Sequence, residues 1–424
     1  MRAALRRGGS WLWTELTRER RWGRGPRRRA GRSSRAGIAL LLTVSIVALL
    51  TVVVTEVVYT ASVRIKMAAN ARDEAAAEAL AQGALGFYQL FLKLSESMEQ
   101  NAFGPQIAAM TGMNALDLWQ FLPSLSTSLL RLFVVTDGDA DEIEAIAAQG
   151  GLSADQRAES QERAKTTLRR PFLAFEGDFT ASVTAEDSRL WVGDISLDAE
   201  GRPNLYSELL IALMARDDDQ TFLRSIGIDD PRELVYNLSD WTDADDNRLF
   251  SGGRESALYD RLDDPYKVKN APFDSVEEIR LVDGWHRDAI WNRYGTQLTI
   301  YGDGKVNVST ASDQVLRAML RSAAKVSATD SYLDDVVRLL RTRLNTPLAE
   351  GGVLFTHDGG LANWLEEWYA GAFDTDKIKR LSMVHSSVYR VTARGEVGEA
   401  TVEIEAIIDF SRSKNGKILS YRIR

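Results

Sequence analysis

The sequence predicts an α+β protein, and three observations lead to this fold class. An uncharged run from Ile38 to Thr55 continues without proline into an amphipathic helical pattern that reaches Leu94. Apolar and polar residues alternate with a period of two over residues 179–197 and again over 387–424, which is typical of half-buried strands. Helical periodicity fills residues 204–345 between these regions. We therefore expect a long N-terminal helix packed on an antiparallel sheet, which a large helical insert interrupts.

The first part of the long helix has the composition of a membrane span. Its uncharged residues would extend about 27 Å as a helix, close to the thickness of the hydrocarbon core of a bilayer. The preceding leader, residues 1–37, carries twelve arginines against Glu15 and Glu19, a net charge of +10. Basic flanks stay in the cytoplasm, so we expect a cytoplasmic N-terminus and an exported body. An ordinary signal anchor would share this hydropathy, and the leader itself is expected to be a disordered or lipid-bound tail.

The charge of the remaining chain limits the partners that it can bind. Without the leader, 40 of the 52 basic residues and 58 of the 60 acidic residues remain, a net charge of −18. Such an acidic exported body argues against a nucleic acid partner. The chain has no cysteine, so disulfides do not stabilise it, and its stability must come from a packed core or from metal binding.

Local patterns predict the elements that follow the long helix. Residues 95–170 are expected to be mostly helical, and residues 179–197 to form a hairpin around a polar turn at Glu186-Asp187-Ser188. Ser275 and Glu278 have the spacing of a capping box at a helix start. The predicted helices of 95–170 cover residues 116–132, with a break at Pro123, and residues 141–148, and residues 153–169 are a polar helix or a linker. The predicted helices of the insert cover 205–214, 220–226, 231–238, 275–281, 287–294, 314–320 and 332–344. The final strands cover 387–392, 401–410 and 417–424, with an Asn415-Gly416 turn before the last of them.

An acidic segment of the insert has the residue types of a hard-cation site. Oxygen-bearing side chains recur at alternate positions, with a further carboxylate beside them and another where a bidentate ligand would close a loop. The segment is not an EF-hand, because Arg248 and Arg254 occupy the positions that need glycine and glutamate. A solvated acidic turn, with Asp240 or Asp243 as a helix cap, remains an open alternative. The predicted calcium ligands are Asp243, Asp245, Asp246, Asn247 and Glu255.

The sequence offers no convincing catalytic constellation. His286, His357 and His385 are far apart, and no pair has the spacing of zinc ligands. The segment 304–312 is similar to phosphate-binding helix-hairpin-helix segments, but its acidic surroundings favour a packing role. No nucleophile lies near a general base in a recognisable pattern, so we expect that the protein is not an enzyme.

The junction between leader and apolar run resembles a type IV prepilin-like N-terminus. A basic leader ends at Gly37, and the resemblance implies that a prepilin peptidase cuts after it and leaves Ile38 as the first mature residue. Most such proteins carry a glutamate at the fifth mature position, where this chain has Leu42. Lack of that glutamate is typical of the minor pseudopilin called general secretion pathway protein K.

Three further segments are similar to the signature of the same family, namely 240–246, 265–282 and 304–312. The resemblance implies a type IV pilin-like fold with a large helical insert, and members of the family bind calcium in this insert, which favours the calcium interpretation. The domains expected on this basis are a leader (1–37), a membrane and spine helix (38–94), the first part of the pilin-like domain with a helical extension and hairpin (95–203), the insert (204–345) and the C-terminal part of the sheet domain (346–424).

The resemblance implies a minor pseudopilin at the tip of the type II secretion pseudopilus, which nucleates assembly and helps to export folded proteins. Its expected partners are the I-, J- and H-type minor pseudopilins, the major pseudopilin, prepilin peptidase, inner membrane lipid, and the secretin and secreted cargo. Its body would lie in the periplasm, anchored in the bacterial inner membrane. Two alternatives remain open: a minor pilin of a type IV pilus, and a membrane-anchored periplasmic enzyme that uses the acidic segment as a metal site.

Overall fold

The computed structural model describes residues 35–99, 118–127, 175–197, 202–325, 327–413 and 415–424. The expectations for the leader, and for the helices at 141–148 and 153–169, lie outside the described residues. The chain divides into two units, residues 1–68 and 69–424, and each is described by itself.

One helix, α1 (Arg35–Glu99), spans the apolar run and the amphipathic stretch, as the uninterrupted pattern predicted. In the first unit its apolar side chains are exposed, including Ile38, Leu42 and Val54. The helix is long and apolar enough to cross a membrane by its length and composition. Since side chains in contact with water would not be apolar over so many turns, this exposed surface fits a lipid environment.

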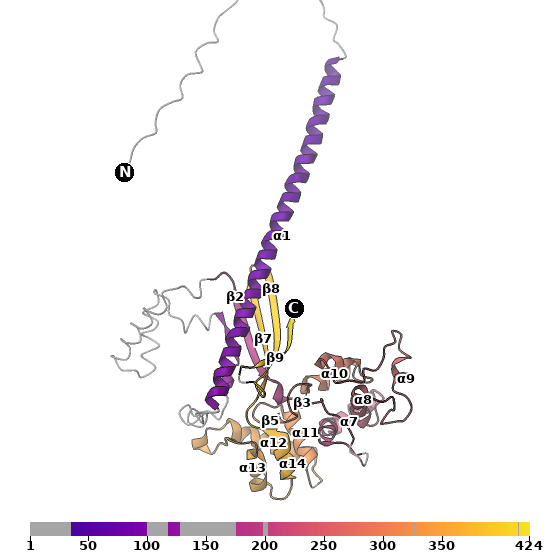
Figure 1. Ribbon diagram of the computed structural model, residues 1–424, viewed down its shortest axis with the longest axis vertical. Coiled ribbons are helices and arrows are strands. Elements are labelled where there is room, and N and C mark those ends of the chain that lie inside the picture. The colour runs from indigo at the N-terminus through magenta and orange to yellow at the C-terminus, as the bar shows by residue number, and fades with distance from the viewer. Residues whose placement is uncertain (1–34, 100–117, 128–174, 198–201, 326, 414) are drawn as a thin grey trace, which may run out of the picture. The chain divides into compact units, whose positions relative to one another are not determined.

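The second unit contains a five-stranded antiparallel sheet in the order β1-β2-β7-β8-β9. Figure 1 shows the second half of α1 running across this sheet. Strand register places Ala393 opposite both Ala181 and Ile404, and all three side chains are buried beneath the helix. This confirms the predicted α+β class and the final three-stranded meander. The strands are β1 (Ser124–Ser126), β2 (Asp178–Ala185), β7 (Val388–Val397), β8 (Ala400–Asp409) and β9 (Lys417–Ile423).

Small residues allow α1 to lie close to the sheet. Ala77, Ala81 and Ala84 face the strands with almost no exposed surface. Gly395 of β7 lies directly beneath them, because a Cβ atom added there would be 2.0 Å from the carbonyl oxygen of Ala77. Tyr88 closes the end of this contact and donates its hydroxyl hydrogen to the carbonyl of Leu122. The backbone of α1 therefore lies in direct contact with the backbone of β7.

Two sequence expectations near this sheet are wrong. The segment 116–132 was expected to be helical with a break at Pro123. Its described part forms a 3₁₀ turn (Leu118–Phe121) before the proline, which cannot continue a helix, but strand β1 follows where the helix was expected to resume. The expected hairpin at 179–197 does not form: β2 pairs with β1 and β7, whereas β3 (Leu190–Trp191) pairs in parallel with β4 (Leu298–Thr299). The period-two pattern identified both strands but carries no information about their partners.

A helical block follows β3 and packs around its own core (Figure 1). Side-chain caps begin several of its helices, with Asn204, Ser312 and Thr329 each accepting a hydrogen bond from the first turn. The helices are α6 (Leu205–Leu213), α7 (Asp217–Ser225), α8 (Arg232–Thr242), α9 (Ser256–Tyr259), α10 (Asp288–Tyr294), α11 (Asp313–Ala323), α12 (Asp330–Asn345), α13 (Gly360–Trp368) and α14 (Thr375–Leu381). This confirms the predicted helices of the insert, although residues 276–281 form a 3₁₀ helix, η3 (Val276–Leu281).

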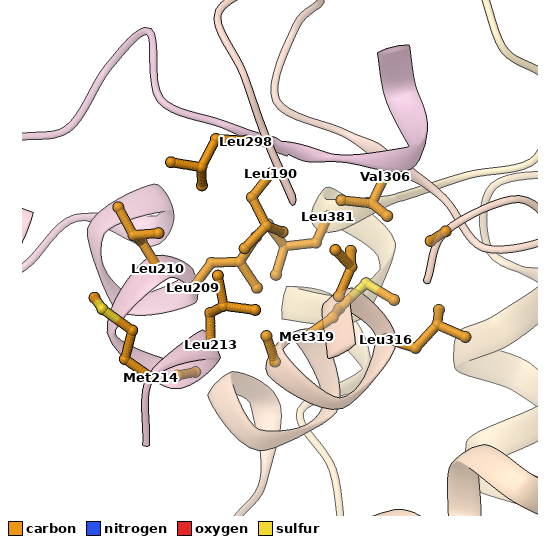
Figure 2. Packing of buried hydrophobic residues seen from close by; sticks show 14 of the residues in the cluster. Leu190, Leu209, Leu210, Leu213, Met214, Leu298, Val306, Leu316, Met319 and Leu381 are labelled. Atoms are coloured by element: carbon orange, nitrogen blue, oxygen red, sulfur yellow. The ribbon is translucent and has the colours of Figure 1, made fainter. Parts of the chain in front are cut away.

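The core of the block joins segments that are far apart in the sequence. Figure 2 shows Leu209 and Leu213 of α6 packed near Met319 of α11 and Leu381 of α14, with Leu190 above them. Two parallel strand pairs, β3 with β4 and β5 (Val306–Asn307) with β6 (Ser382–Met383), lie at the edge of this core. Because α13 and α14 contribute to the same core, the block extends beyond residue 345 to the start of β7.

Candidate cation site and spine helix

Three carboxylates meet where α8 ends and α9 begins. Asp240 lies in the last turn of α8, and Asp243 is the extended residue that terminates this helix. Glu255 directly precedes α9, and a carboxylate oxygen from each residue lies within 4.8 Å of the other two. The loop between the helices thus folds back and brings Glu255 close to Asp240 and Asp243, although Glu255 follows both by twelve or more positions.

Burial makes this arrangement electrostatically costly. Glu255 is only 1% exposed, and neither of its carboxylate oxygens has a hydrogen-bond partner. Burial, with the nearby Asp243 and Asp240 carboxylates, raises the pKa of Glu255 to about 8. Burial likewise raises the pKa of Asp240 to about 7. Two ionised carboxylates 4.8 Å apart repel by about 3.5 kcal/mol at an effective dielectric constant of about 20.

Three such pairs would cost about 10 kcal/mol, which is comparable to the whole stability of a typical domain. The cluster therefore needs protons or a cation at neutral pH. Carboxylate oxygens are the ligands that calcium prefers, and a buried carboxylate without any partner is the group that such an ion would satisfy. The donor set fits a hard cation.

The structure brings together only some of the residues that the sequence predicted as ligands. Asp243 and Glu255 lie in the cluster, and Asp240, which the sequence suggested only as a cap, joins them. Asp246 turns away, because it accepts hydrogen bonds from Nε of Arg254 at 2.6 Å and from the backbone of Ser256 at 2.9 Å. The position of Asp240, one helical turn before Asp243, was the signal available for placing both carboxylates on one face.

The other two predicted ligands form the turn itself. A carboxylate oxygen of Asp245 accepts a hydrogen bond from the backbone N–H of Asn247 at 2.7 Å. The carbonyl of Asp245 in turn accepts a hydrogen bond from the side chain of Asn270 at 2.9 Å. These contacts hold the acidic loop in shape, and Asp245 is not one of the three clustered carboxylates.

Aromatic packing and hydrogen bonds fix the segments next to the cluster. Trp241 packs edge-on against Tyr259, and its ring nitrogen donates to Glu278 at 3.0 Å. Ser275 accepts a hydrogen bond from the backbone N–H of Glu278, as the capping box predicted, whereas the carboxylate of Glu278 accepts from the backbone N–H of Asp274, one residue before the expected partner. Asn270 adopts a positive φ of 49° and donates its backbone N–H to the carbonyl of Trp241. The carboxylates are therefore attached to a framework that aromatic packing and hydrogen bonds fix in place.

The candidate processing site lies on α1. Gly37 has no neighbouring atom within 4 Å of the position that a Cβ would take, and Ile38 is exposed. Further along, in the second unit, Phe87, Leu90 and Leu94 form an apolar stripe on the side of α1 turned away from Gln89 and Lys93, which contact Asn415. Leu90 is 67% exposed, so this stripe is available to another helix.

Comparison with known proteins gives a match within the helical block. Residues 212–301, which include the three-carboxylate cluster, match the family model described as type II secretion system, protein K. This segment of the chain is similar to protein K of the type II secretion system. The resemblance seen in the sequence signature of the insert is thereby confirmed for these residues.

One solved structure with a similar chain is the GspK-GspI-GspJ complex from the type 2 secretion system of enterotoxigenic Escherichia coli. The sequence identity is 15% and the TM-score is 0.45, and the alignment covers 67% of this chain and 99% of that chain. None of the curated proteins compared with the chain matches it.

Proposed function

We propose that this protein is a minor pseudopilin that caps the tip of a type II secretion pseudopilus. The observation that carries the proposal is the protein K match over residues 212–301 in a chain whose long helix α1 is apolar enough to cross a membrane in its first part and packs on an antiparallel sheet in its second part. In this role the protein would nucleate assembly with other minor pseudopilins and help folded proteins to cross the outer membrane. Its role is structural, and no enzymatic step is proposed.

The N-terminal helix would first anchor the precursor and later lie in the filament. The +10 leader supports a cytoplasmic N-terminus at the inner membrane, with residues 69–424 in the periplasm. Prepilin peptidase would cut between Gly37 and Ile38, where no neighbouring side chain of the described residues obstructs the glycine. The apolar surface that lipid covers in the precursor would then pack against other helices.

Two features favour a single copy at the tip. Leu42 stands where most pilins carry a glutamate that pairs with the terminal ammonium of a neighbouring subunit. A charge without its partner at bilayer depth costs about 2.5 to 3.5 kcal/mol or more, so this subunit would not accept another ammonium ahead of it. The helical block adds bulk to the sheet domain, and an identical copy would not fit above it in a closely spaced helical filament.

The spine helix offers the surface for neighbouring subunits. Phe87, Leu90 and Leu94 recur at spacings of three and four, the pattern by which parallel helices pack. We propose that this stripe contacts the spine helix of another minor pseudopilin of the I, J or H type, and that the major pseudopilin follows below. The secretin and the secreted cargo would contact the periplasmic body of the protein, residues 69–424.

We also propose that Asp240, Asp243 and Glu255 hold a calcium ion. The unpartnered oxygens of Glu255 and the mutual repulsion of the three carboxylates support this assignment. When bound, the ion would neutralise the cluster and fasten the start of α9 to the end of α8. Asp245, Asp246 and Asn247 would shape the loop around it. Aromatic packing holds the residues around the cluster in place, so we expect the ion to have a structural role.

The mature N-terminus tests the proposed class directly. We expect that the full chain, coexpressed with a prepilin peptidase, yields a product whose mass and N-terminal sequence begin at Ile38. Gly37→Val should block the cut because the peptidase reads the residue before the scissile bond, whereas the matched leader variant Gly31→Val should be processed. A wild-type chain that stays uncut while a control pilin is processed in the same cells would refute the proposal.

A further inference from the structure

The sheet and the helical block are joined at one place by two passages of the chain. The outgoing passage is the 3₁₀ turn η2 (Glu186–Ser188), which directly follows β2. The returning passage, residues 384–387, directly precedes β7. The two passages are neighbours, because Ala185 at the end of β2 pairs with Tyr389 near the start of β7. Two adjacent passages alone would allow the block to swing about them as a hinge.

A buried carboxylate ties the two passages together. One oxygen of Asp187 accepts hydrogen bonds from the backbone N–H groups of Ser387 at 2.7 Å and Val388 at 2.9 Å. Asp187 is 2% exposed, so water does not compete for these donors. Leaving one buried backbone donor without a partner costs about 1 to 3 kcal/mol, and separating the passages would leave two.

The preceding residue ties the joint to both modules. Glu186 is fully buried, and its Oε1 accepts from Nε of Arg390 in β7 at 2.6 Å and from Arg189 at 3.1 Å. Its other oxygen accepts from the hydroxyl of Thr299 in β4, which belongs to the block. Arg390 reaches on to Glu405 of β8 at 2.8 Å. Two arginines thus balance two glutamates, and every group has a partner, which is the condition under which a buried polar network rigidifies its surroundings.

A third contact lies away from the passages. Arg422 of β9 pairs with Glu277 of η3 at 2.7 Å, although both side chains are partly exposed. Such a pair contributes little stability by itself. Its position matters more than its strength, because a contact away from the two passages opposes rotation about them.

We propose that Glu186 and Asp187 form a rigid joint that makes the sheet and the helical block move as one body. Interfaces within a chain normally allow relative motion of the parts they join. Here a displacement of the sheet would reach the block without bending at the joint. The consequence for secretion rests on the proposed function: a filament that extends from below can push with its tip only if the tip does not fold aside.

Distance distributions between spin labels test the joint. The chain has no cysteine, so the full-length protein in detergent can be labelled at two introduced cysteines alone. One pair, Thr401→Cys in β8 and Thr342→Cys in α12, reports across the joint from exposed positions; a second pair, Thr221→Cys and Thr342→Cys, lies within the block. We expect the two pairs to give equally narrow distributions, and a broader distribution across the joint of the unaltered protein would overturn the proposal.

Variants of Asp187 identify the cause of the stiffness. Asp187→Ala removes the acceptor and should broaden the distribution across the joint but not the one within the block. Asp187→Asn keeps a carbonyl oxygen that accepts both N–H groups, so it should restore the narrow distribution. Asp219→Ala is the matched control, since Asp219 is a buried carboxylate that accepts from Arg293 and Tyr294 inside the block. A distribution that stays narrow in Asp187→Ala, or that broadens equally in Asp219→Ala, would contradict the assignment.

Secretion of a folded cargo by cells that carry each variant separates this inference from the proposed function. If the joint transmits force, Asp187→Ala should reduce secretion more than Asp187→Asn does at equal protein levels. A narrow distribution in a protein whose deletion leaves secretion unchanged would refute the proposed function and leave the joint intact.

Discussion

Replacing Glu255 by glutamine should have opposite effects on stability with and without calcium. The substitution keeps the shape of the side chain and removes its charge, and with it two of the three carboxylate pairs within 4.8 Å. At about 3.5 kcal/mol for each fully ionised pair at 4.8 Å, the relief would be about 7 kcal/mol, and protons that the cluster already holds make it smaller. With a chelator at pH 8 or above, Glu255→Gln should therefore unfold at a higher temperature than the unaltered chain.

Calcium should reverse this order. An ion present at about 100 times its dissociation constant stabilises the folded state by about 2.7 kcal/mol, which raises the melting temperature of the unaltered protein by several degrees. Glu255→Gln should lose most of this increase because the buried ligand is gone. Near-ultraviolet circular dichroism follows the nearby Trp241 during heating, and Glu367→Gln, an exposed glutamate of α13, is the control. An unaltered protein that calcium does not stabilise, or a Glu255→Gln variant that calcium stabilises fully, would refute the reasoning.

Three further predictions concern other parts of the molecule. Gly395→Val should lower the free energy of unfolding in urea by about 3 kcal/mol or more, since its Cβ would collide with the carbonyl of Ala77; an unchanged value would show that α1 does not approach the sheet this closely. Burial raises the pKa of Asp187 to about 7, above its unfolded value of 3.8, so its contribution to stability is complete below about pH 4 and is lost as the pH rises through 7. Asp187→Asn should make the free energy of unfolding depend less on pH between pH 4 and 8. A dependence as steep as that of the unaltered protein would contradict this prediction. Leu90→Asp should weaken copurification of other minor pseudopilins without lowering the melting temperature, whereas Gln82→Asp, on another exposed face of α1, should do neither; equal binding by both variants would exclude the stripe as the contact.

Periodicity in the sequence located most of the helices and strands that the structure describes. The helices α6, α8, α11 and α12 were expected within a few residues of their observed ends, because polar caps and apolar stripes mark them locally. Strands β7, β8 and β9 were expected because short turns connect them. Such elements depend on interactions between residues that are close in the sequence.

Partners of strands were harder to predict. The polar triplet Glu186-Asp187-Ser188 has the composition of a solvated turn, yet its two carboxylates are buried against groups that follow it by more than a hundred positions. The local sequence gives no indication that Thr299 or Val388 contacts this triplet. Strand β2 therefore looked like half of a local hairpin when its partner was a distant strand.

The candidate cation site could also be predicted only in part from the sequence. The choice of Asp243 and Glu255 rested on residue type and spacing, and both lie in the cluster. Asp240 also lies in the cluster, but the sequence suggested it only as a cap, because a residue near a helix end is more often a cap. Asp246 was included because it is adjacent, but the hydrogen bonds of Arg254 and Ser256 draw it away. Residue type limits the candidates, and only the fold of the loop selects among them.

The register of β2 against β7 also explains how so large a block can belong to a small sheet. Their facing ends, at Ala185 and Tyr389, are as close as in any antiparallel pair joined by a tight turn. The chain between Asp187 and Val388, 201 positions apart, thus occupies the place of a hairpin loop. Insertions at such a loop leave every strand pairing of the sheet unchanged, and the entropy of closing a loop grows only slowly with its length. Under the proposed function, the sheet and α1 keep the geometry that a filament subunit needs, and this single loop supplies the head that a particular position in the filament requires.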